Sequence, residues 1–66
     1  MNPSLAERLN RLVKETLVSP RTGIGKPEAL KNNLQGVWSR RLTNEHRLLY
    51  RVYEPFIVFV SARDHY

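Results

Sequence analysis

The sequence predicts a small α+β domain: an antiparallel meander of three strands packed against one long and one short α-helix. Apolar residues recur at spacings of three and four near the N-terminus, and from residue 37 they alternate with polar residues. The first spacing is that of an amphipathic helix, and alternation is typical of strands with one buried face. Short turn sequences separate the alternating segments, and such turns join antiparallel neighbours.

The composition indicates one domain, residues 1–66, with a polyanionic partner. The chain has no cysteine, and its 11 Lys+Arg against 6 Asp+Glu give a formal net charge of +5. This length is near the lower limit for a hydrophobic core, and no disulfide or thiolate zinc site supports it. The charge favours nucleic acid, an anionic membrane surface or an acidic protein. We expect a cytoplasmic protein, because no signal peptide is visible and no apolar run approaches the roughly 18 residues of a membrane span.

The long helix is predicted to begin near residue 2 and to end near Val18. Ser4 and Glu7 have the spacing of a capping box, in which each side chain bonds to the backbone N–H of the other residue. Pro20 cannot continue the helix. The apolar stripe consists of Leu5, Leu9, Leu12, Val13 and Leu17. We interpret the basic residues as a solvated face, with RNA contact as the alternative: Arg8, Arg11 and Lys14.

A short helix is predicted over residues 28–33. Pro27 suits a first helical turn, and Leu30 and Leu34 are one turn apart. On these residues alone, Glu28 is interpreted as an acidic residue stabilised by the helix dipole.

Strands are predicted over residues 37–42, 45–53 and 56–62. Alternation in the second strand places Leu48 and Tyr50 on a packed face, with Arg47 and Arg51 on an open face. Residues 56–60 are all apolar, which predicts a central strand that is buried on both faces.

The chain ends in two residues that are suited to acid–base chemistry, His65 and Tyr66. Histidine titrates near neutrality and can donate a proton to a leaving oxygen, although a frayed terminus is the alternative interpretation. Cleavage of RNA needs a base, an acid and positive charge, and Glu28, His65 and the arginines can supply these. We expect no metal and no cofactor, because His46 and His65 lack the ligand spacing of a metal site.

Four motifs carry a resemblance to a known family: K-P-E-x-L-K at residues 26–31, W-S-R-R at 38–41, E-H-R-L-x-Y at 45–50 and the terminal H-Y. With the sequence between them, they are similar to the YoeB/Txe toxins of the RelE superfamily, bacterial mRNA interferases that pair with an antitoxin. The resemblance runs from about Ser4 to Tyr66. Family members begin with a strand and a further helix that have no counterpart here, so we expect an N-terminally short RelE-like domain.

The resemblance implies a metal-independent endoribonuclease that cleaves mRNA in the ribosomal A site through the ribose 2′-hydroxyl and so inhibits translation. The implied catalytic residues are Glu28 as base, His65 as acid, Arg47 and Tyr66. The cations expected to contact RNA are Lys31, Arg40, Arg41 and Arg51. The implied partners are a YefM/Axe-like antitoxin and mRNA on the ribosome, and no membrane.

Two alternatives stay open. A related fold, that of the gyrase-inhibiting ParE toxins, acts by binding protein, but the K-P-E glutamate and the terminal His-Tyr argue against this class. A catalytically impaired chain that only binds antitoxin or RNA is the other alternative.

We also expect a homodimer or another self-associated state, since an open sheet edge and an uncovered apolar face attract partners.

Overall fold

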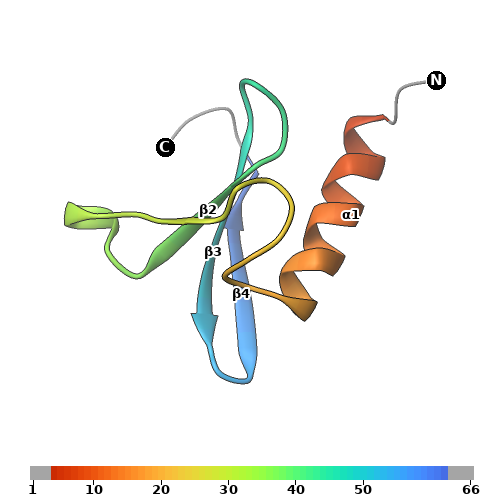
Figure 1. The fold of residues 1–66 in the computed structure, drawn as a ribbon. Coiled ribbons are helices and arrows are strands. Elements are labelled where there is room, and N and C mark those ends of the chain that lie inside the picture. Colours follow the sequence, from red (N-terminus) through yellow and green to blue (C-terminus); the bar gives the residue numbers. More distant parts are fainter. Residues whose placement is uncertain (1–3, 63–66) are drawn as a thin grey trace.

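The computed structural model describes residues 4–62, in which one helix lies beside a four-stranded antiparallel sheet (Figure 1). The predicted α+β class is confirmed. The elements are α1 (Leu5–Val18), β1 (Glu28–Ala29), a 3-10 turn (Asn32–Leu34), β2 (Val37–Arg41), β3 (Arg47–Tyr53) and β4 (Phe56–Ser61). The strands are ordered β1-β2-β3-β4. Within the described residues, no helix has both the length and the apolar character needed to cross a membrane.

The helix α1 begins with the predicted capping box. The Ser4 backbone N–H donates to Glu7 Oε1 at 2.8 Å, and the Glu7 N–H donates to Ser4 Oγ at 3.1 Å. The hydrogen bond from the Ser4 backbone, together with that from its hydroxyl, lowers the pKa of Glu7. Leu12 is buried against the sheet, whereas Leu5 and Leu17, at the two ends of the predicted stripe, are about half exposed.

The two faces of the sheet carry separate apolar clusters. Leu48 and Tyr50 pack beneath α1 with Leu12, as the alternation predicts. The opposite face was expected to be open, but Leu49 is buried there by Leu30 and Val37. This second cluster supports the outer face of the sheet.

The predicted short helix over residues 28–33 is wrong. Glu28 lies in β1, opposite Ser39 of β2, and the Leu30 N–H donates to the Val37 carbonyl at 2.9 Å. Only a 3-10 turn follows. Leu30 and Leu34 both pack in the second cluster although the segment between them is not an α-helix. Their spacing of one helical turn therefore does not require a helix. The sheet therefore has four strands rather than three.

The predicted central position of the last strand is also wrong for the described sheet, because β4 lies at its edge. Its exposure alternates along the strand. Ile57 and Phe59 pack toward the cluster beneath α1, whereas Phe56, Val58 and Val60 are 70%, 49% and 55% exposed. The strand thus presents an uncovered apolar face.

Arg40 is fully buried and ties the loop after α1 to the sheet. Its guanidinium lies 5.9 Å from the centre of the Tyr50 ring. The prediction that Arg40 contacts RNA is therefore wrong, because the side chain is out of reach and its donors are used internally. It donates to Tyr50 Oη at 3.1 Å, to the Ile24 carbonyl at 2.9 Å, to the Thr22 carbonyl at 2.8 Å and to the Ser19 carbonyl. The Tyr50 hydroxyl donates in turn to the Pro20 carbonyl at 2.6 Å.

The same loop meets β2 again at Gly25, whose carbonyl accepts the Arg41 N–H at 2.6 Å. Gly25 has a φ of +80°. A Cβ at this position would lie 2.9 Å from the Arg41 carbonyl oxygen and 3.0 Å from Leu12 Cδ1. Only glycine therefore lets the loop approach β2 this closely.

Arg40→Met should lower the free energy of unfolding by about 3 kcal/mol or more, because each buried acceptor left without a donor costs about 1–3 kcal/mol. Arg41→Met, at the exposed neighbouring position, is the matched control and should change stability by no more than about 0.5 kcal/mol. Urea denaturation of the two variants measures the difference. Equal losses would contradict the structural role of Arg40.

Gly25→Ala should destabilise the chain by about 1–3 kcal/mol more than Gly36→Ala, because added volume in a packed site forces displacement. Both glycines have positive φ, so both variants bear the same backbone penalty. At Gly36, however, the added Cβ meets only the end of the Arg51 side chain. Thermal melting of the two variants gives the comparison, and an equal loss would show that the close approach at Gly25 is unimportant.

Candidate active site

A cavity of about 440 Å³ brings together three of the predicted site residues. Glu28, Arg41 and Arg47 line it with Lys26 and Pro27. The strand register explains this grouping. Glu28 lies opposite Ser39, and Arg41, two residues further along β2, lies opposite Arg47. Residues at these positions project from one face of a sheet, so one carboxylate and two guanidinium groups surround the same hollow.

The charged groups of this cavity are available to a ligand. Glu28 and Arg41 are exposed and Arg47 is half-buried. Among residues 4–62, none of the three forms an ion pair; the ion pair in this part of the chain joins Arg21 to Glu54 at 3.1 Å. Two facing arginines repel one another across a strand pair. An anion bound between them would relieve that repulsion.

The other predicted site residues that the structure describes do not line this cavity. Lys31 is exposed just after β1, and Arg51 is half-buried on β3, opposite Val37. His65 and Tyr66 lie outside the described residues, so their roles stay predictions. The pairing of Glu28 with β2, and not a position at a helix N-terminus, is what places it at the same cavity as the arginines.

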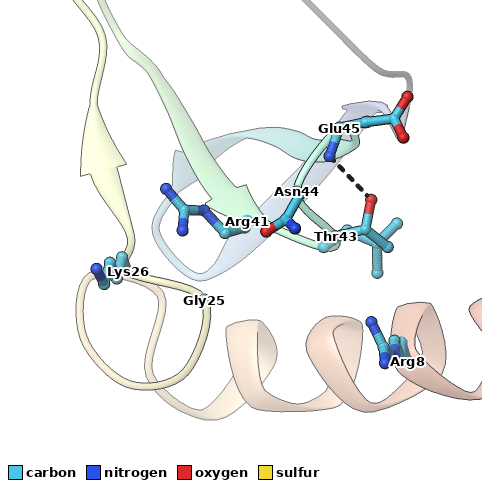
Figure 2. A pocket seen from close by; sticks show the side chains of 8 residues that line it. Arg8, Gly25, Lys26, Arg41, Thr43, Asn44 and Glu45 are labelled. Atoms are coloured by element: carbon cyan, nitrogen blue, oxygen red, sulfur yellow. Dashed lines mark hydrogen bonds between the residues drawn. The ribbon is translucent and has the colours of Figure 1, made fainter. Parts of the chain in front are cut away.

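Lys26 and Arg8 are two further cations that sequence reasoning did not assign to the site. Lys26 lines the Glu28 cavity and a second one of about 550 Å³, which Arg8 of α1 reaches. The presence of Lys26 in the K-P-E motif was a usable signal. For Arg8, periodicity offered only a choice between solvent and RNA. The second cavity is lined by Arg8, Gly25, Lys26, Arg41, Leu42, Thr43, Asn44 and Glu45 (Figure 2).

The turn between β2 and β3 forms one wall of the second cavity. The Thr43 hydroxyl accepts the backbone N–H groups of Glu45 at 3.2 Å and His46 at 3.0 Å. The His46 carbonyl accepts the N–H groups of Leu42 and Thr43 at 2.9 and 3.1 Å. These bonds hold the turn in one shape, which fixes the position of Asn44 at the cavity (Figure 2).

Comparison with known proteins gives one consistent family. A family model described as a YoeB-like toxin of a bacterial type II toxin–antitoxin system matches residues 1–66. Toxin YoeB of Escherichia coli K12 is 47% identical over 62 residues, which cover 94% of this chain and 74% of that protein. Toxin YoeB of Synechocystis is 48% identical, with 94% of this chain and 72% of that protein covered.

Solved structures agree with the sequence comparison. A YoeB/ParE toxin from Agrobacterium tumefaciens superposes with a TM-score of 0.87 at 39% identity, covering 94% of this chain and 75% of that one. The YoeB–YefM complex from Staphylococcus aureus gives a TM-score of 0.85 at 43% identity, covering 94% and 72%. The resemblance drawn from the four sequence motifs is thereby confirmed, as is the RelE-like fold, and the chain belongs to the YoeB-like toxin family of bacterial type II toxin–antitoxin systems.

Proposed function

We propose that this toxin is a metal-independent endoribonuclease that cleaves mRNA on the ribosome in the bacterial cytoplasm and so inhibits translation. The observation that supports this most directly is the cavity that Glu28 lines together with Arg41 and Arg47. A carboxylate can accept a proton from a hydroxyl, and guanidinium groups stabilise charge that develops on phosphate oxygens. Membership of a toxin family and the net charge of +5 agree with an RNA substrate.

The proposed reaction is an intramolecular transesterification. Glu28 accepts the proton of the ribose 2′-hydroxyl, and the 2′-oxygen attacks the adjacent phosphorus. The bond from phosphorus to the 5′-oxygen breaks, and His65 gives that oxygen a proton. The products are a 2′,3′-cyclic phosphate and a 5′-hydroxyl. Arg41 and Arg47 neutralise the additional negative charge of the pentavalent transition state.

The remaining predicted residues take supporting roles in this proposal. Tyr66 orients the substrate or His65, an assignment that rests on the terminal H-Y motif. Lys31 and Arg51, which do not line the cavity, contact the RNA backbone in this proposal, where each neutralises a phosphate.

The proposed partners are an antitoxin of the YefM type and a second copy of the chain. Solved relatives include a YoeB–YefM complex and a YoeB dimer, both from Staphylococcus aureus. The exposed apolar side chains of β4 and the edge position of that strand offer a surface for either partner.

Glu28→Gln and His65→Gln should each lower translation-dependent mRNA cleavage by roughly 10²-fold or more, because each removes a proton-transfer group. Primer extension on mRNA from programmed ribosomes measures the cleavage. Glu54→Gln, whose carboxylate pairs with Arg21 away from the cavity, is the control and should cleave normally. Undiminished cleavage by both catalytic variants would overturn the assignment. A wild-type chain that binds antitoxin but never cuts mRNA would favour the catalytically impaired alternative.

Replacing the ribose on the 5′ side of the cut bond by its 2′-deoxy or 2′-O-methyl form should abolish cleavage, because the nucleophile is then missing. The same substitution one nucleotide further away is the control and should leave cleavage intact. Chemical analysis of the unmodified products should find a 2′,3′-cyclic or 3′-phosphate. A 5′-phosphate on the downstream product would point instead to attack by water.

A further inference from the structure

The cavity of about 550 Å³ beside the Glu28 cavity has no role in the reaction steps given above. The two cavities share Lys26 and Arg41, so a linear polymer that is bound in one cavity can continue directly into the other. A volume of this size lies within the range of small-ligand sites, roughly 300–1,000 Å³. The second cavity is therefore large enough for a nucleotide unit.

The charge of the second cavity suits a phosphate. Arg8 from α1, Lys26 from the loop and Arg41 from β2 all line it. In Figure 2, Arg8 and Lys26 lie on opposite sides of the hollow, with Arg41 and Asn44 between them. The carboxylate of Glu45 points away from both Arg8 and Lys26 (Figure 2). Three cations from separate elements thus line this cavity, while the single lining carboxylate is turned outward.

The backbone at Lys26 is a second, independent sign of a binding site. Among the described residues, Lys26 is the non-glycine residue with a positive φ, +50°. The left-handed conformation costs an L-residue about 1–2 kcal/mol, and such strain concentrates at functional sites. Gly25, just before it, also has a positive φ. Together these two residues turn the chain so that the Lys26 side chain lines both cavities.

Asn44 supplies a different kind of contact. Its side-chain amide carries both donors and an acceptor, and it extends into the space between Arg41 and Arg8 (Figure 2). Unpaired RNA bases are recognised through hydrogen bonds to their edges. The hydrogen-bonded turn described above holds Asn44 in place, so this contact is pre-organised.

We propose that this second cavity binds the RNA nucleotide next to the cleaved phosphate, with Arg8 and Lys26 contacting its phosphate and Asn44 contacting its base. The inference rests on the proposed ribonuclease function and extends it to a second nucleotide. It makes Arg8 a substrate contact on α1, whereas Lys14 of the same helix lines neither of the two cavities.

Arg8 is tested by RNA binding in the Glu28→Gln background, in which the RNA is not cut. The probe is a fluorescent single-stranded RNA hexamer, followed by anisotropy at several salt concentrations. Arg8→Gln should weaken binding roughly tenfold at low salt and should reduce the slope of log K against log salt by about 0.7, the value for one phosphate contact in single strands. Lys14→Gln, an exposed substitution on the same helix, is the matched control and should change neither quantity.

Asn44 is tested by cleavage specificity with the otherwise unaltered chain. Asn44→Ala should change the relative cleavage of mRNAs that differ at the nucleotide next to the cut. Arg8→Gln should instead lower cleavage of all of them by a similar factor, because a phosphate contact carries no sequence information. Circular dichroism should find both variants folded.

Three results would overturn the proposal, and they differ from one another. If Arg8→Gln behaves like Lys14→Gln in affinity and salt slope, the cavity is not an RNA subsite. If Arg8→Gln weakens antitoxin binding and leaves RNA binding unchanged, the cavity serves the antitoxin instead. If the wild-type chain neither binds nor cuts RNA, the ribonuclease function itself fails, and the subsite fails with it.

Discussion

The buried guanidinium of Arg40 is the interaction on which the rest of this structure depends. A charged group is tolerated inside a protein only when its donors are satisfied. Here the acceptors are backbone carbonyls of the loop after α1, not a carboxylate, together with the hydroxyl of Tyr50. These loop carbonyls have no strand to pair with, so the arginine and the loop satisfy each other. The path of the chain into Lys26 and Glu28 follows from this contact.

Two neighbouring arginines therefore have opposite roles. Arg40 points toward α1 and organises the fold, whereas Arg41 points to the outer face and lines the cavities. The alternation of a strand separates them completely. The small cluster of Leu30, Val37 and Leu49 packs on the outer face of the sheet. The charged groups on this face therefore lie beside packed apolar side chains.

Local patterns predicted those features that depend on local chemistry. The capping box at Ser4 and the alternation that places Leu48 and Tyr50 on one face of β3 are both of this kind. The same alternation places Arg40 on the face of Tyr50, so its burial was readable in principle. The path of residues 28–33 was not, because the spacing of Leu30 and Leu34 fits a helix as well as a strand followed by a turn. Pairing with β2 decides between them, and that contact is non-local.

The same distinction applies to the candidate site: some of its residues belong to sequence motifs, and others reach it only through the three-dimensional packing. Glu28 and Arg47 were predicted from short motifs, through the family resemblance that these carry, and both line the same cavity. Arg8 belongs to no such motif and reaches its cavity only through the packing of α1. The edge position of β4 likewise depends on what lies beside the strand, which an apolar run cannot reveal.

The facing pair Arg41 and Arg47 has a consequence for how the free toxin differs from its complexes. Like charges opposite one another across two strands weaken the sheet. Any polyanion that binds there adds its binding free energy to the stability of the fold. Ligand binding and folding are then thermodynamically linked at this position, whichever anion occupies it. A complex that places negative charge between the two arginines is therefore more resistant to unfolding than the free chain.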